Sequence, residues 1–210
     1  IRNGNLLDNL DSIILEIKSS NKTNLIICNH VKTSQSVFKK LSDEFQNIAL
    51  LHSRFNAKDR MNIESRIQNE KTRPNILVAT QTVEVSLDLD YDCGYIEPAP
   101  ADALGQRLGR INRRGSRLKP APIVIFEEPS AKIKKEPLYL PYDKDVTKKT
   151  INMLKKCNLL TEQQLINIVD EIYASGYQGD SKSDYEKGIG NTFIKEFDKN
   201  IIAGDRKSVV

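Results

Sequence analysis

The amino-acid sequence predicts an α/β protein in which helices cover both faces of a parallel β-sheet. Four short runs are apolar throughout, at residues 25–28, 48–51, 76–79 and 123–126, and a shorter one lies at residues 95–96. Segments with apolar residues at helical spacing separate these runs. Apolar strands that alternate with helices are typical of a parallel sheet buried on both faces.

The predicted elements follow one another along the chain. Helical spacing begins in residues 6–17, returns in residues 37–45 and 63–67, and predicts a further helix over residues 101–110. These segments lie before, between and after the apolar runs, so the order is helix, strand, helix, strand. Residues 83–90 alternate apolar and polar side chains, which by itself favours an edge strand.

A change of character after Phe126 divides the chain. Glu127, Glu128 and Pro129 lead into a lysine-rich, proline-containing stretch. We therefore predict a first domain over residues 1–129 and a linker with a mainly helical C-terminal extension over residues 130–210. Helical spacing recurs at residues 146–154, 165–173 and 193–197, and residues 174–190 read as a loop.

Composition bounds the class of protein. The chain has 210 residues, 39% of them hydrophobic, and a net charge of +4, which alone does not argue for nucleic-acid binding. Three widely spaced cysteines favour a reducing cytoplasm, and no apolar run approaches a membrane span or an export signal. Because the sequence lacks an initiator methionine, we expect a piece of a longer protein.

Polar residues follow three of the apolar runs. They are Asn29 to Ser34 after the first, His52 to Phe55 after the second, and Thr80 to Thr82 after the third. Ligands of open parallel sheets gather at the carboxyl ends of the strands, and these residue types suit phosphates. The alternative is that Thr33, Ser34 and Thr80 only cap helices.

Arginines recur every three residues at Arg107, Arg110 and Arg113. On a helix this spacing would gather positive charge along one side, which suits the charge of phosphoryl transfer. A solvated basic face or a nuclear-targeting run is the alternative. Gly109 and Gly115 count against it, because each weakens a helix by about 1 kcal/mol.

Metal sites find little support in the sequence. Asp88, Asp90 and Asp92 have the spacing of a calcium loop, but Gly94 falls one position late and Ala99 replaces the required acid. His30 and His52 lack neighbouring ligands, and the pairs 43–44 and 170–171 read as solvated charges. A G-x-x-x-x-G-K-[ST] phosphate loop is also absent from the sequence.

Taken in order, Leu25 to Asn29, Leu51 to Phe55, Val78 to Asp90 and Gln106 to Gly115 resemble the motifs of the second RecA-like lobe of superfamily 2 helicases. Within that superfamily, residues 78–90 and 100–107 look most like the CRISPR-associated helicase of type I interference systems. A DEAD-box protein would usually carry Ala-Arg-Gly-Ile-Asp at residues 84–88 and histidine in place of Gln106. The resemblance is strong over residues 20–128 and looser at residues 140–143 and 169–173.

The resemblance implies a RecA-like fold and a role for each motif residue. Arg110 and Arg113 would be arginine fingers on the ATP phosphates, and Gln106 would lie near the γ-phosphate and the attacking water. Asp88 would contact the ribose, and Arg107 would help to bind the nucleotide. The implied contacts to the DNA backbone are Thr80, Gln81, Asn29, His52 and Arg54.

The family also implies cofactors and partners. ATP and Mg²⁺ would bind with a first helicase lobe that holds most of the magnesium ligands, so this chain alone would be inactive. Single-stranded DNA, an RNA-guided surveillance complex and a metal-dependent HD nuclease domain or subunit are the expected partners; a membrane is not. The sequence leaves open another superfamily 2 repair or RNA helicase, or an ATP-independent nucleic-acid-binding module.

Overall fold

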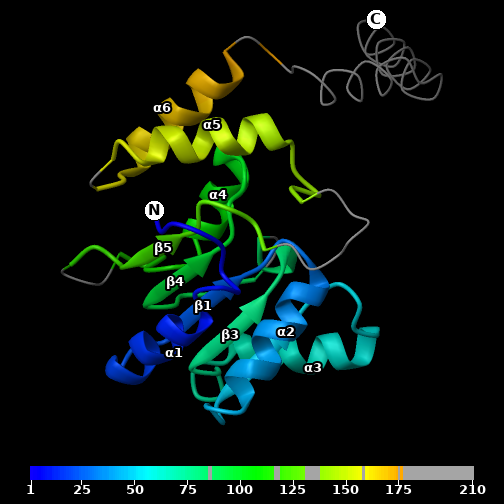
Figure 1. The fold of residues 1–210 in the computed structure, drawn as a ribbon. Coiled ribbons are helices and arrows are strands. Elements are labelled where there is room, and N and C mark those ends of the chain that lie inside the picture. Colours follow the sequence, from blue (N-terminus) through cyan, green and yellow to red (C-terminus); the bar gives the residue numbers. More distant parts are fainter. Residues whose placement is uncertain (85–86, 116–118, 131–137, 158, 175, 177–210) are drawn as a thin grey trace, which may run out of the picture. The chain divides into compact units, whose positions relative to one another are not determined.

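The computed structural model in Figure 1 describes residues 1–84, 87–115, 119–130, 138–157, 159–174 and 176. By its contacts the chain divides into two compact units, residues 1–168 and 169–210. The first unit holds the entire sheet described below. The division after residue 129 that the sequence favours stays a prediction, and the expected third helix at residues 193–197 lies outside the described residues.

The fold is a parallel sheet with intervening helices, as the sequence predicts. The strands are β1 (Asn24–Ile27), β2 (Ile48–Leu51), β3 (Ile76–Ala79), β4 (Cys93–Ile96) and β5 (Ile123–Ile125), in the spatial order β2-β3-β1-β4-β5. All four strand pairs are parallel. The helices are α1 (Leu10–Ser19), α2 (Val31–Ser42), α3 (Ala57–Gln68), α4 (Ala101–Leu108), α5 (Lys144–Leu154) and α6 (Glu162–Tyr173), with a short 3₁₀ helix η1 (Gln81–Val83).

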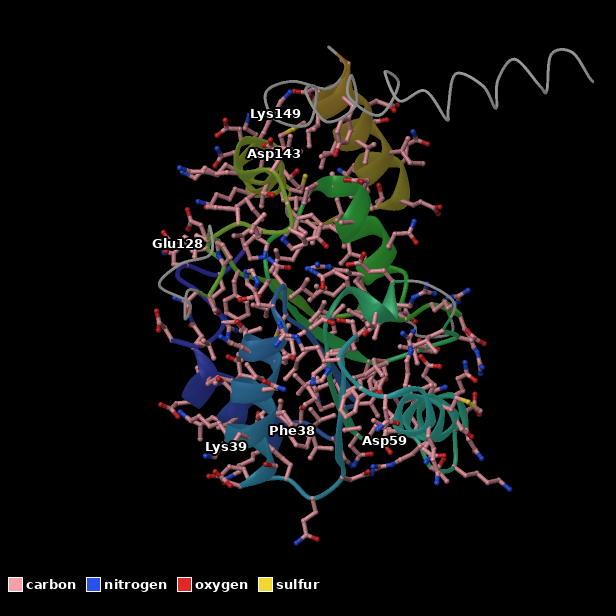
Figure 2. All side chains as sticks on the ribbon, turned by 90° about the vertical axis from the view of Figure 1, so that its right-hand side faces the viewer. Phe38, Lys39, Asp59, Glu128, Asp143 and Lys149 are labelled. Carbon is pink, nitrogen blue, oxygen red and sulfur yellow. The ribbon has the colours of Figure 1, made fainter. Side chains whose placement is uncertain are left out.

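Helices α1 and α2 cover one face of the sheet. Their apolar residues form a single buried cluster with one side of the strands, which includes Ile26, Val78 and Tyr95. Helical periodicity produces this arrangement, because only one side of each helix is apolar. Figure 2 labels two neighbours on α2 that show the contrast: Phe38 packs against the cluster and Lys39 is exposed.

The opposite face of the sheet is also buried. Leu25, Ile27, Leu77 and Ile96 alternate with the residues of the first cluster and are completely buried. Side chains of a strand point alternately to the two faces, so both sides of the sheet are covered. This double burial explains why the strands read as continuous apolar runs.

Local sequence signals fix several helix starts. Asn56 caps α3, because its Oδ1 accepts the backbone N–H of Asp59 at 2.9 Å. Asp143, labelled in Figure 2, caps α5 through Oδ1, which accepts the N–H groups of Asp145 and Val146 at 2.8 and 2.9 Å. Such caps satisfy backbone donors that a helix leaves unpaired.

No helix in the described part of the chain is long and apolar enough to cross a membrane.

The expectation of an edge strand at residues 83–90 is wrong for the residues that the structure describes. Residues 81–83 form η1 and residues 87–90 pair with no strand, while residues 85–86 lie outside the described part. Leu87 and Leu89 are buried and Asp88 is exposed, so the alternation is real. It reflects a stretch with one buried side, whose backbone is held by arginine side chains instead of a neighbouring strand.

The expectation of a helix that carries all three arginines is also wrong. Helix α4 ends at Leu108, and Gly109 caps it. Beyond it, the Tyr91 N–H donates to the Arg110 carbonyl at 3.1 Å and the Asn112 N–H donates to the Tyr91 carbonyl at 2.9 Å. This bridge and the positive φ of Asn112, 47°, take the chain out of the helix. Arg110 and Arg113 therefore lie in an irregular segment beside residues 83–84 and 87–91.

Gly94 in β4 makes room for this segment. A Cβ built on Gly94 would overlap Cδ1 of Ile111 and lie 3.6 Å from Cδ1 of Ile96. Ile111 is itself buried. The close approach of strand and segment therefore requires a residue without a side chain.

We predict that Gly94→Ala lowers the free energy of unfolding by about 1–3 kcal/mol, because overpacking a buried site forces its neighbours to move. Ile111→Val removes the overlapping Cδ1 and alone costs about 0.5–1.5 kcal/mol. The double variant should be more stable than the sum of the two losses predicts, as measured by denaturant unfolding. Strict additivity would contradict the contact.

Candidate functional site

The site is built at the carboxyl edge of the sheet. Register places Ile27 of β1 between Ala79 of β3 and Ile96 of β4, so these strands end side by side. The residues that follow the strands are Asn29 after β1, His52 after β2, Thr80 after β3 and Glu97 after β4. All four are buried. These polar groups are therefore buried from solvent, so each of them needs a hydrogen-bond partner.

Asn29 joins three of the four strand ends. Its backbone N–H donates to Glu97 Oε2 at 2.6 Å and its side-chain amide donates to the Pro98 carbonyl at 2.9 Å. Its own carbonyl accepts the Gln81 side-chain amide at 2.9 Å. Asn29 and Gln81, both predicted to contact DNA, thus hold β1, β4 and η1 together.

Arg107 lies at the centre of this edge and is completely buried. Its Nε donates to Glu84 Oε1 at 2.8 Å, and its Nη1 donates to the Glu97 carbonyl at 3.0 Å. Its Nη2 donates to Asn29 Oδ1 at 3.0 Å and to the Tyr142 hydroxyl at 2.7 Å. The Tyr142 ring lies 5.4 Å from the guanidinium carbon. Four of the five N–H donors of the guanidinium thus bond to other residues that the structure describes, and its predicted contact with nucleotide stays a prediction.

Arg110 and Arg113 are more accessible. Arg110 is half-buried, and its Nε and Nη2 donate to the carbonyls of Val83 and Glu84 at 2.9 and 2.6 Å. Arg113 is exposed, its Nε lies 3.3 Å from Asp88 Oδ1, and its backbone N–H donates to Asp90 Oδ1 at 2.9 Å. The structure therefore brings Arg110, Arg113 and Asp88 together.

The positive charges of Arg110 and Arg113 repel each other within this group. Burial and the neighbouring Arg113 lower the pKa of Arg110, whereas Asp88 and Glu84 act in the opposite direction. Arginine remains charged at neutral pH in any such environment. Two guanidinium groups close enough to repel each other form a place where an anion is favoured.

His52 and Arg54 lie at the end of β2. The His52 ring is buried, stacks on Phe55 at 4.3 Å, and accepts the Arg54 N–H at Nδ1 at 3.3 Å. Burial is the main cause that lowers the pKa of His52, so the neutral ring is favoured. The Arg54 side chain is exposed. His52 therefore shapes the turn that presents Arg54.

Two other predicted site residues differ in accessibility. Thr80 is buried and precedes η1, but its side chain makes no capping hydrogen bond. Gln106 is exposed on α4, one residue before the buried Arg107. Thr33 and Ser34 lie inside α2, where His30 occupies the N-cap position, so they are not caps.

Among the residues that the structure describes, no three metal-ligating side chains gather in one place.

The sequence analysis missed Glu97 and Tyr142. Glu97 is completely buried, and its carboxylate accepts the backbone N–H groups of Asn29 and Ser130 at 2.6 and 2.7 Å. Inspecting the residue after the fourth strand, as after the first three, would have found it. Tyr142 lies in residues 140–143, which were noted only for a looser family resemblance, and no periodicity there points to the sheet.

Comparison with known families now bears on this edge. Residues 20–116 match the sequence model of the Cas3-like C-terminal family, described as "CRISPR-associated nuclease/helicase Cas3, C-terminal". These residues belong to that family. They contain β1 to β4, Arg107, Arg110, Arg113 and Asp88. The match to this family thus includes most of the sheet edge just described.

Two relatives extend the likeness. A CRISPR-associated nuclease/helicase Cas3 of Methanocaldococcus jannaschii is 32% identical over 204 residues, which are 94% of this chain and 26% of the relative. The CRISPR-associated endonuclease/helicase Cas3 of Escherichia coli is 39% identical over 117 residues, which are 51% of this chain and 13% of the relative. The Cas3-like chain thus spans about a quarter or less of these relatives.

Solved structures agree on the fold. T. fusca Cas3 with ADP matches with a TM-score of 0.68 and 24% identity over 89% of this chain and 26% of that one. Structures of the same protein with ATP and AMPPNP match with TM-scores of 0.67 and 0.66. A CRISPR RNA-guided surveillance complex, pre-nicking, contains a chain that matches with a TM-score of 0.59 and 22% identity over 89% of this chain and 26% of that one.

We predict that Arg107→Ala lowers the free energy of unfolding of the Cas3-like chain by about 3–5 kcal/mol, because it leaves Glu84 and Asn29 without their buried partner. Denaturant unfolding monitored by circular dichroism measures the change. Arg114→Ala is the matched control, since Arg114 is exposed and pairs with the exposed Glu70. Equal midpoints for the two variants would show that the buried network is not structural.

Proposed function

We propose that this chain is the second motor lobe of an ATP-dependent helicase that translocates on single-stranded DNA in CRISPR interference. The observation that carries the proposal is the group of Arg110, Arg113 and Asp88. Two neighbouring guanidinium groups, one oriented by backbone carbonyls and one exposed, match the negative charge that phosphoryl transfer develops. T. fusca Cas3, a protein of the same fold, has structures with ADP, ATP and AMPPNP.

Each residue at the nucleotide takes a separate role. Arg110 and Arg113 act as arginine fingers on the phosphates, and the exposed Gln106 lies near the attacking water. Asp88 exchanges its pairing with Arg113 for a contact with the ribose. The pair is exposed, so breaking it costs little. Arg107, predicted to bind nucleotide, contributes by holding Glu84 in place.

The nucleic-acid contacts fall at the ends of β2 and β3. Arg54 is exposed and positively charged, so it is the best placed of the predicted residues to bind a phosphate. His52 supports Arg54 by accepting the Arg54 backbone N–H at Nδ1. Asn29, Thr80 and Gln81 act mainly through the backbone arrangement that they stabilise.

The whole protein would close a cleft around ATP. The P-loop and most ligands of Mg²⁺ belong to a first lobe. Hydrolysis opens the closed state, so that the contacts with DNA shift along the strand. The relatives named nuclease/helicase and the surveillance-complex structure support an HD nuclease and an RNA-guided complex as partners. A cytoplasmic location fits this role.

In the full-length protein, Arg110→Ala and Arg113→Ala should each lower ATP turnover by about 10³-fold, the typical contribution of an arginine finger. Single-stranded DNA binding at fixed salt should change far less. Arg114→Ala is the control, because it removes the same charge from an exposed neighbour. Loss of DNA binding with turnover intact would favour an ATP-independent binding module.

The isolated chain should hydrolyse no ATP, because its sequence has no G-x-x-x-x-G-K-[ST] loop to hold the phosphates. A phosphate-release assay with and without single-stranded DNA tests this expectation. Turnover that disappears in the Arg110→Ala chain would refute the division of labour between two lobes. Turnover that persists in that variant would indicate a contaminating enzyme.

A further inference from the structure

Tyr142 reaches the site from outside the helicase motifs. It lies 35 residues beyond Arg107, directly before α5, yet its hydroxyl accepts Arg107 Nη2 at 2.7 Å. The same hydroxyl donates to Glu84 Oε1 at 3.3 Å. Its ring packs against the Arg107 guanidinium. Tyr142, which follows the helicase motifs in sequence, thus contacts both members of the pair of the buried Arg107 and the partly buried Glu84.

Glu84 connects this pair to the candidate fingers. Its carboxylate accepts Arg107 Nε and the Tyr142 hydroxyl, while its backbone carbonyl accepts Arg110 Nη2 at 2.6 Å. A residue held at both its side chain and its backbone has little freedom to rotate. The Val83 carbonyl holds Nε of the Arg110 guanidinium, and the position of Nη2 depends on how firmly Glu84 is held.

We propose that Tyr142 is a positioning residue for Arg110 and acts through Glu84. Through Tyr142, the position of residues 138–143, which precede α5, determines whether the nucleotide site is active. The inference rests on the proposed function, since it gives Arg110 a role in turnover. Any movement that withdraws Tyr142 loosens Glu84 and with it the arginine. The segment before α5 thereby acts on ATP turnover without touching ATP.

The hydroxyl, more than the ring, carries this role. A phenol can accept from a guanidinium and donate to a carboxylate at the same time, whereas a phenylalanine ring can do neither. Burial raises the pKa of Tyr142, so the proton that it donates to Glu84 is retained at neutral pH. Tyr142→Phe consequently removes the link and keeps the packing.

The test uses the full-length protein with Tyr142→Phe and, as the matched control, Tyr139→Phe. Tyr139 belongs to the same segment, and its hydroxyl takes no part in these contacts. Tyr142→Phe should lower kcat for ATP about tenfold, roughly the rate equivalent of one hydrogen bond, and leave KM within about twofold. A purely structural defect would instead reduce kcat and DNA-binding capacity in the same proportion.

A double-variant cycle with Arg110→Ala separates the outcomes. If Tyr142 acts through Arg110, adding Tyr142→Phe to Arg110→Ala should lower kcat by less than about twofold further. Independent, multiplicative losses would overturn the proposed path. Normal kcat in Tyr142→Phe, with Arg110→Ala impaired, overturns this inference alone. Normal kcat in Arg110→Ala overturns the proposed function, and this inference with it.

Discussion

The buried guanidinium of Arg107 is the interaction on which the carboxyl edge of this sheet depends. A charge removed from water is tolerated only when its donors are paired, and here the pairs come from four distant parts of the chain. They are Asn29 after β1, Glu84 after η1, the carbonyl of Glu97 after β4, and Tyr142 before α5. One cation thus fixes the relative positions of three loops and the start of the C-terminal segment.

The buried Glu97 and the partly buried Glu84 are satisfied in different ways. Glu84 is the counter-ion of Arg107, at 2.8 Å, whereas the carboxylate of Glu97 accepts two backbone N–H groups. Because Glu97 takes its bonds from Asn29 and Ser130, it joins the end of β1 to Ser130. Ser130, through Glu97, and Tyr142, through Arg107, are therefore both bound to the same edge of the sheet. That arrangement ties the C-terminal segment to the helicase motifs through satisfied polar groups, which are costly to break.

The fold was predictable because burial on both faces leaves a direct trace in sequence, in runs such as residues 25–28 and 76–79. The candidate site was predictable only as a set of strand ends and motifs. Spacing alone treated Arg107, Arg110 and Arg113 as equivalent, yet tertiary contacts end the helix at Leu108 and separate them. The segment with Tyr142 was noted for its family resemblance, but its contacts could not be predicted, because they lie 35 and 58 residues away and no local pattern encodes such a distance.

The three arginines instead form a gradient of burial along one segment. Arg107 is enclosed, Arg110 is held at two nitrogens by carbonyls, and Arg113 is exposed beside Asp88. Donors that are oriented before a ligand arrives lose little freedom when charge develops, and this is the condition for electrostatic stabilisation of a transition state. Arg113 is exposed and its pair with Asp88 is exposed too, whereas Nε and Nη2 of Arg110 are both bonded to backbone carbonyls. The rigid interior around Arg107 is thus what allows a partly exposed arginine to have a defined direction.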